Sequence, residues 1–381
     1  MHDHTPDHLQ EVFNQFAVEG EFIQADPYGA GHINDTFVGQ FRAGAVTNRT
    51  ILQSINHKVF KEPEKVMENI QRVTRYARQQ IVARDGDPDR ETLNLIPTRS
   101  GEWFLRTPDG VYWRMYQFIP GASTYDVAQN LEQVYHAAKA FGNFQKLLDS
   151  LPGPRLHETI PNFHHTGKRF TWFLEVLGRD PANRAAAVKA EIEFILKRGE
   201  DATRVIDLLA QGALPERVTH NDTKLNNVML DDQTGEGICV IDLDTMMPGS
   251  ILYDFGDLIR MGTATAAEDE PDLNKVGVDL RLFEPLTRGY LDATRDFLTP
   301  QELDLLVFSG RLITYEQAIR FLGDYINGDT YYKIQREGHN LDRARTQIKM
   351  LSEMERQQDE MEKIVQFYRR ARDWSGRYAA A

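Results

Sequence analysis

The sequence changes character once, at Pro120-Gly121, and this change limits what the chain can fold into. Before it, short apolar runs separated by turn residues predict three strands, at 22–25, 36–41 and 50–53. A helix is expected at 63–79, where apolar residues repeat at helical spacing. Two further runs, 102–105 and 111–116, flank Asp109-Gly110, which is typical of a β-hairpin.

Beyond Pro120-Gly121 the apolar periodicity is mostly helical. It predicts helices at 131–148, 184–211, 300–325 and 342–374. One non-helical island, 218–249, contains strand-like runs at 228–230 and 238–241. We therefore expect an α+β fold with a small antiparallel β lobe over residues 1–119 and a larger, mostly helical lobe over residues 120–381.

Composition excludes several classes of protein. The 381 residues carry 44 Lys and Arg against 57 Asp and Glu, a formal net charge of −13. Because such a chain repels phosphate backbones and shows no basic stripe, no nucleic-acid partner is expected. Cys239 is the only cysteine, which excludes an intramolecular disulfide and a cysteine-rich zinc site. Without a signal-like start or an apolar stretch approaching ~20 residues, we expect no membrane association and a cytoplasmic location.

The strongest chemical signal is the octet His220 to Asn227, followed by a strand that ends at Asp242. Phosphoryl transfer needs a carboxylate beside the attacking hydroxyl and oxygen ligands for Mg²⁺. Asp222 and Asn227 supply a carboxylate and a carboxamide at the two ends of one short loop, and Asp242 supplies a second carboxylate. The alternative, that Asp222 and Asn227 are only turn or capping residues, does not account for the strand ending at Asp242.

A second match to a kinase motif is interpreted differently. Asp254-Phe255-Gly256 has the letters of the protein-kinase metal motif but lies thirty-two residues beyond Asp222. We read it as the start of a helix, with Asp254 as a cap or structural hydrogen-bond acceptor. The metal is therefore assigned to Asp242.

The loop between the first two strands is a candidate phosphate-binding loop. Gly29 and Gly31 let a backbone approach a phosphate closely, although Asn34 takes the place of a third glycine. The third strand carries Gln53 where protein kinases have a lysine, and a glutamine side chain has no charge. Either Mg²⁺ neutralises more of the phosphate charge, or Lys58 or Lys61 reaches the site.

The segment 218–227 resembles the aminoglycoside-phosphotransferase superfamily, and within it the N-acetylhexosamine 1-kinases. The likeness extends over nearly the whole chain and includes segments 28–34, 51–53, 241–250, 320–325 and 343–349. That family also has glutamine on its third strand. The resemblance implies a bilobal protein-kinase-like fold, with a nucleotide-binding lobe over 1–119, a catalytic and substrate-binding lobe over 120–381, ATP as co-substrate and Mg²⁺ as cofactor.

The resemblance also implies roles for individual residues. Asp222 would take the proton of the sugar hydroxyl, Asn227 and Asp242 would hold Mg²⁺, and Asp244 would support the metal site. The nucleotide would be bound by Gly29, Gly31, Gln53, Gln117, Phe118 and Ile119, with adenine against the last three. The sugar would contact His32, Asp222, Arg320 and Tyr331. The plain readings of Arg320 and Tyr331 are a surface helix charge and a partly buried core aromatic.

The function expected is ATP-dependent phosphorylation of the anomeric hydroxyl of N-acetylglucosamine or N-acetylgalactosamine by a monomer or weak homo-oligomer. One alternative is a kinase of the same fold that acts on choline, homoserine or an aminoglycoside, although Arg320 favours a neutral or anionic acceptor. The other is a non-catalytic nucleotide-binding module. The missing lysine favours that alternative, whereas the intact Asp222, Asn227 and Asp242 argue against it.

Overall fold

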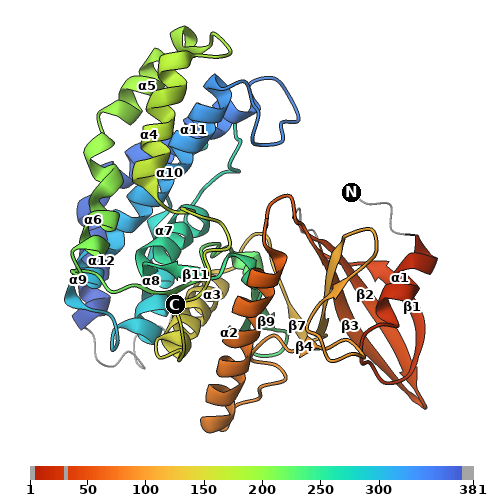
Figure 1. Ribbon diagram of the computed structural model, residues 1–381. Helices are drawn as coiled ribbons and strands as arrows, with labels where there is room; N and C mark the ends of the chain where they lie inside the picture. The colour runs from red at the N-terminus through yellow and green to blue at the C-terminus, as the bar shows by residue number, and fades with distance from the viewer. Residues whose placement is uncertain (1–4, 30–32, 371–381) are drawn as a thin grey trace.

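The computed structural model describes residues 5–29 and 33–370. A β-rich lobe and a larger helical lobe lie side by side, as expected from the sequence (Figure 1). The small lobe has an antiparallel sheet of order β1-β2-β3-β6-β4, and β5 also pairs with β6. Its strands are β1 (Glu21–Pro27), β2 (Asp35–Ala43), β3 (Val46–Ile55), β4 (Leu95–Ile96), β5 (Leu105–Arg106) and β6 (Tyr112–Gln117).

The three strands predicted first are confirmed and are longer than expected. The hairpin is confirmed at its turn only, because β5 starts at Leu105 and pairs with β6 at Trp113 and Tyr112. Helix α1 (Pro6–Phe13) packs on one face of the sheet through Phe13, which lies in a buried cluster with Trp113. Helix α2 (Pro63–Ala83) instead joins the core of the large lobe.

The large lobe is built around one packed helix pair, α3 with α8, and a group of three helices in which α10 packs against α7 and α11. Its helices are α3 (Leu131–Leu148), α4 (Thr166–Arg179), α5 (Lys189–Leu196), α6 (Arg204–Ala210), α7 (Ile251–Gly262), α8 (Leu280–Thr294), α9 (Pro300–Asp304), α10 (Leu306–Ile326), α11 (His339–Arg356) and α12 (Gln358–Arg370). Helix α3 has the bounds that the sequence predicts.

Three of the predicted long helices are interrupted. The helix expected at 184–211 divides into α5 and α6, separated by a 3₁₀ turn at Gly199–Thr203. Gly199 packs so closely against Phe170 that the ring would be 2.7 Å from an added Cβ, and a larger residue would not fit there unless the ring moved. The helix expected at 300–325 is broken at Leu305, and that at 342–374 is broken at Gln357, whose amide donates to the Val278 carbonyl.

Two helices of the large lobe were not predicted, α4 and α8. Helix α8 contains Pro285, and an internal proline argues against a helix when only the sequence is considered. Its burial against α3, where Phe283, Leu286 and Tyr290 lie in the core, stabilises the helix despite the proline. Tertiary packing therefore overrides the local signal.

Short strands within the large lobe position the predicted octet. Strands β9 (Val228–Asp231) and β10 (Gly237–Val240) form the hairpin predicted at 228–230 and 238–241, and β7 (Ala122–Ser123) extends it. Strands β8 (Arg217–Thr219) and β11 (Met247–Gly249) form a second pair. The octet thus runs from the end of β8 to the start of β9.

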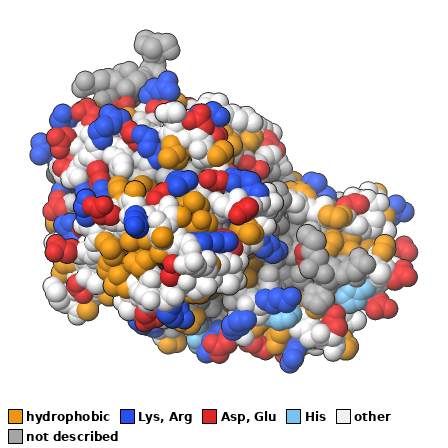
Figure 2. Space-filling model, turned by 90° about the horizontal axis from the view of Figure 1, so that it is seen from above, with side chains coloured by type: hydrophobic (Ala, Val, Ile, Leu, Met, Phe, Trp, Pro, Cys, Tyr) orange, Lys and Arg blue, Asp and Glu red, His pale blue; other side chains and the backbone are white. Residues whose placement is uncertain are grey.

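Two features of the surface and the helices can be described. Within residues 5–29 and 33–370, no helix is both long and apolar enough to cross a membrane. On the face shown in Figure 2, Lys and Arg side chains are interspersed with Asp and Glu and do not gather into a stripe.

Candidate active site

The loop that follows β8 is fixed by hydrogen bonds to Asp254 on α7. Its carboxylate is fully buried and accepts hydrogen bonds from the backbone N–H groups of His220 (2.9 Å) and Asn221 (2.7 Å) and from the Gln145 amide (2.7 Å). Burial raises the pKa of Asp254, and these donors offset part of that effect. The interpretation of Asp254 as a structural acceptor is confirmed. The cap of α7 is Ser250 instead, whose Oγ accepts from Leu252 N.

His220 ties the loop to the end of β10. Its Nδ1 faces the Asp222 N–H at 3.3 Å and can only accept there, so Nε2 carries the proton and donates to the Ile241 carbonyl at 2.9 Å. Both Asn221 (φ 66°) and Asp242 (φ 58°) adopt left-handed backbone conformations. These turns bring Asp222 and Asp242, which lie at the ends of different segments, to the same side of the lobe.

The carboxylate of Asp222 is oriented by two other members of the octet. Lys224 Nζ lies 2.8 Å from Asp222 Oδ1, and Asn227 Nδ2 lies 3.2 Å from Asp222 Oδ2 and 2.8 Å from the Asp222 carbonyl. Burial would lower the pKa of Lys224, but the carboxylates of Asp222 and Asp257 outweigh it and raise that pKa. Lys224 is a site residue that the sequence reasoning missed, although it lies inside the octet.

Asp242 lies in a negatively charged environment. Part of the residue is open to solvent, but protein surrounds its carboxylate on most sides. Loss of water around the carboxylate raises the pKa of Asp242 most, the charges of Asp244 and Asp222 add to this, and the pKa reaches about 6. Three carboxylates close enough to repel one another are the environment that a divalent cation stabilises. Within the described residues, no group of three or more His, Cys, Asp and Glu side chains is arranged to hold a metal by itself. A metal at this place would need a ligand of another type, and the Asn227 carboxamide lies beside Asp222.

A buried arginine occupies the neighbourhood of the missing kinase lysine. Arg114 on β6 is 1% exposed, forms an ion pair with Asp244, and donates to Gln53 Oε1 at 2.9 and 3.1 Å. Lys58 and Lys61, the residues considered for this task from the sequence, are both exposed. Arg114 was missed, and the available signal was a charged residue in the otherwise apolar run 111–116.

Asp244 joins the two lobes. One carboxylate oxygen pairs with Arg114, and the other accepts a hydrogen bond of 2.6 Å from Asn34, which lies just before β2. Asn34 in turn accepts from the Asn56 N–H at 3.0 Å. The residue that interrupts the glycine pattern is thus a contact between the glycine loop and the large lobe.

The segments predicted to bind nucleotide lie next to one another in part. Gly29 has φ 78°, a conformation that favours glycine, and the adjacent Tyr28 ring is 6.0 Å from the Phe118 ring in the connection between the lobes. The Arg49 guanidinium lies over the Phe118 ring, 3.7 Å from its centre. Gly31 and His32 lie outside the described residues.

Two of the predicted acceptor-binding residues, Arg320 and Tyr331, lie near the C-terminal end of α10. The Arg320 guanidinium lies 5.8 Å from the centre of the Phe163 ring and 5.5 Å from that of Tyr332. Tyr331 is 68% exposed and its ring packs edge-on against Tyr332 at 4.8 Å. Arg320 is therefore a partly buried cation among aromatic rings rather than a surface charge, and Tyr331 is not a core residue.

Comparison with known proteins identifies the family. Residues 27–287 match the model of the phosphotransferase enzyme family, and the chain belongs to that family. The fold is similar to that of an aminoglycoside phosphotransferase from Alicyclobacillus acidocaldarius, with a TM-score of 0.61 at 12% identity over 94% of this chain and 96% of that one.

Two other solved structures share the fold. An amicoumacin kinase in complex with AMP-PNP and Ca²⁺ has a TM-score of 0.56 at 12% identity, covering 90% of this chain and 92% of that one. A microcompartment-associated aminopropanol kinase has a TM-score of 0.54 at 13% identity, covering 93% and 98%. The protein is thus a member of the phosphotransferase enzyme family and shares its fold with these kinases.

Proposed function

We propose that this protein is an ATP-dependent kinase that phosphorylates the anomeric hydroxyl of an N-acetylhexosamine, giving the sugar 1-phosphate. The observation that carries the proposal is the placement of Asp222. It is a partly exposed carboxylate, fixed by Lys224 and Asn227 and close enough to Asp242 to raise the pKa of that residue. A fixed carboxylate beside a negatively charged oxygen cluster is what transfer from a metal nucleotide to an alcohol requires.

In this proposal each residue of the loop has one task. Asp222 accepts the proton of the sugar hydroxyl as the phosphoryl group is transferred. Asn227 and Asp242 would hold Mg²⁺, which supplies charge neutralisation for the phosphates when bound. Asp244 supports the metal site from behind, because both of its oxygens are already engaged by Arg114 and Asn34. Gln53 and Gly29 would face the phosphates, and Gln117, Phe118 and Ile119 would border adenine.

Arg114 weakens the main argument for a non-catalytic module. The lysine position carries the uncharged Gln53, but the buried guanidinium of Arg114 lies within hydrogen-bond distance of that side chain. A positive charge is thus held at this strand by a neighbouring strand.

The acceptor proposal rests on Arg320 and Tyr331. An exposed tyrosine face and a guanidinium suit a neutral polyhydroxyl ring with an amide group, and a cationic acceptor would be repelled by Arg320. The structural relatives with an aminopropanol and an aminoglycoside in their names keep an amino-alcohol acceptor as the alternative.

An ADP-release assay with a panel of acceptors tests the proposal. The panel contains N-acetylglucosamine, N-acetylgalactosamine, glucose, choline, homoserine and an aminoglycoside, each with and without Mg²⁺. We expect Mg²⁺-dependent ADP release with an N-acetylhexosamine and loss of its reducing end, because the product is substituted at the anomeric carbon. Release with choline or an aminoglycoside supports the amino-alcohol alternative. ATP binding without release for any acceptor supports a non-catalytic module.

A further inference from the structure

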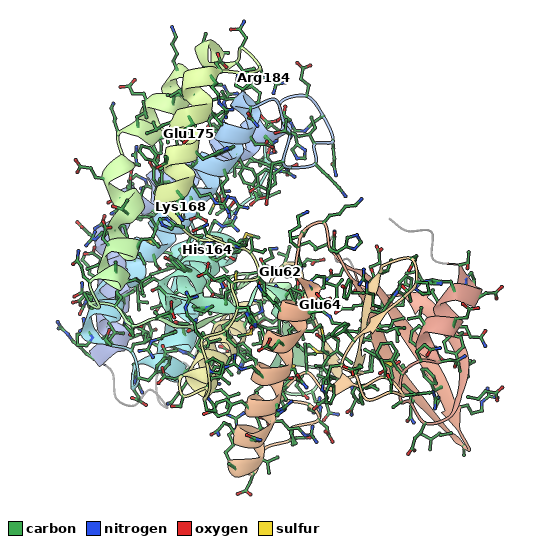
Figure 3. All side chains as sticks on the ribbon, viewed as in Figure 1. Glu62, Glu64, His164, Lys168, Glu175 and Arg184 are labelled. Atoms are coloured by element: carbon green, nitrogen blue, oxygen red, sulfur yellow. The ribbon has the colours of Figure 1, made fainter. Side chains whose placement is uncertain are left out.

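A buried histidine–glutamate pair lies behind the catalytic loop. His164 lies at the base of α4, near α7 (Figure 3). Its Nδ1 is 2.9 Å from Oε1 of Glu316 on α10, and its Nε2 is 3.3 Å from the carbonyl oxygen of Asn221. The side chain of His164 is 4% exposed and that of Glu316 is fully buried. Neither residue has a role in the site described above.

The partners of His164 define its protonation state. A backbone carbonyl can only accept, and an ionised carboxylate can only accept, so both ring nitrogens donate and the ring is an imidazolium. The second oxygen of Glu316 accepts from Thr166 Oγ1 at 2.6 Å, which supports the ionised form. Burial opposes both charges, but each partner stabilises the other, so the pKa of His164 is raised and that of Glu316 is lowered. The alternative, a neutral pair with the proton on Glu316, is distinguishable by experiment.

The carbonyl that His164 holds belongs to the peptide unit that leads into Asp222. The rest of Asn221 is fixed as well: its N–H donates to Asp254 at 2.7 Å and its side-chain amide donates to the Thr245 carbonyl at 2.9 Å. Because Asn221 is buried, its backbone carbonyl also needs a hydrogen-bond donor. The donor from His164 completes the set.

We propose that His164 and Glu316 are positioning residues that fix the Asn221–Asp222 peptide unit, and through it the direction of the Asp222 carboxylate. The inference rests on the proposed function in so far as it assigns Asp222 the proton-accepting role. Glu316 also lies one helical turn before Arg320 on α10, and the Arg320 charge acts on it. The acceptor-binding end of α10 and the catalytic loop are thus attached to the same buried pair.

Two substitutions separate positioning from general stability. His164→Leu removes the donor, whereas His164→Gln keeps an N–H close to the position of Nε2 without the charge. We expect kcat to fall about tenfold in His164→Leu and about two- to threefold in His164→Gln. The KM for ATP should be unchanged, because the hydrogen-bond partners of the pair are Asn221 and Thr166 and not the residues proposed to bind nucleotide. His157→Gln is the matched control, since it removes an exposed His–Glu pair (2.7 Å to Glu68) that does not touch the loop, and should leave kcat unchanged.

Two nuclear magnetic resonance readouts do not depend on activity. In protein labelled with ¹⁵N-histidine, both ring nitrogens of His164 should be protonated near neutral pH. In protein labelled with ¹⁵N-aspartate, the Asp222 amide resonance should shift in His164→Gln and not in His157→Gln.

Each outcome bears on the proposal. A neutral His164 ring, an unmoved Asp222 resonance, or folded His164→Leu protein with normal kcat overturns it. If His164→Leu does not fold, the kcat of His164→Gln and the two nuclear magnetic resonance readouts test the proposal instead. If the unaltered protein phosphorylates none of the acceptors, the proposed function fails, while the Asp222 resonance still decides whether the pair positions the loop.

Discussion

At the scale of single residues, the chemistry of the site depends on what each carboxylate has as neighbours. Asp222, Asp242 and Asp244 are the same residue type within a short stretch of chain, yet their surroundings differ. Asp222 is paired with Lys224, Asp244 with Arg114, and Asp242 has mainly other carboxylates beside it. The least compensated of the three is the best candidate for a metal ligand, and the partly exposed, oriented one for a base.

The role of Asp222 leads to the first prediction. Asp222→Asn keeps the size of the side chain but cannot accept the hydroxyl proton, so turnover in the ADP-release assay should fall by ~10²–10⁴-fold. The thermal unfolding temperature should change little, because the side chain is partly exposed. Retention of most of the activity would remove Asp222 from the proton-accepting role.

The role of Asp242 leads to the second. Asp242→Ala should abolish the Mg²⁺-dependent part of ATP binding, measured by titration calorimetry with Mg²⁺ and with a chelator, because a charged oxygen ligand is lost. Asp232→Ala, which alters an exposed aspartate in the turn of the β9–β10 hairpin, is the control and should bind like the unaltered protein. If Mg²⁺ strengthens ATP binding by Asp242→Ala as much as it does for the unaltered protein, the metal ligand lies elsewhere.

At the scale of elements, helices α4, α7 and α10 converge behind one loop. Helix α7 holds the loop through Asp254. His164, which lies just before α4, contacts the loop at the Asn221 carbonyl and is itself paired with Glu316 of α10. The pieces of chain that support the site are therefore buried helices of the large lobe. The proposed catalytic and metal-binding groups, Asp222 and Asp242, lie in loops next to short strands. This division lets a rigid core fix the position of residues that must face a substrate.

The pairing of α4 with α10 leads to a prediction on pH. The groups facing His164 are Glu316, Asp257 and Tyr253, with Arg320 acting on Glu316. Burial lowers the pKa of His164, but the two carboxylates more than offset this, so the folded-state pKa lies above the unfolded value of about 6.5. The stability contributed by the charged ring is then complete below about pH 6.5 and is lost as the pH rises through the folded pKa.

Urea unfolding of the unaltered protein and His164→Gln between about pH 6 and pH 9 measures this contribution. The difference in unfolding free energy should be largest at the acidic end and shrink as the pH rises. A difference that stays constant with pH would show that His164 does not change its charge state relative to the unfolded chain.

At the scale of the whole molecule, the two lobes are joined by a polar contact beside the site. Asp244 of the large lobe is 2% exposed and pairs with Arg114 and Asn34 of the small lobe. Because Asp244 lies two residues after Asp242, this contact holds the small lobe in a fixed position relative to the proposed metal site. The buried cluster that contains α2 also extends across the junction.

This junction leads to the fourth prediction. Arg114→Met leaves Asp244 buried without its cation, and should lower the free energy of unfolding by about 3–5 kcal/mol. The double variant Arg114→Met with Asp244→Leu removes both charges and should regain part of this loss, as measured by urea unfolding. Additive effects of the two single substitutions would show that the pair does not interact.

The two-lobe organisation, the octet and the strand ending at Asp242 follow from the sequence, because they depend on periodicity and on spacings within one short segment. The division into α5 and α6, the break at Gln357 and the formation of α8 around Pro285 do not, since packing decides them. The hydrogen-bond and ion-pair partners within the site could not be predicted from the sequence either. Arg114 meets Asp244 across 130 residues and His164 meets Glu316 across 152. No local pattern encodes such pairs, because only the folded core brings distant segments to hydrogen-bond distance.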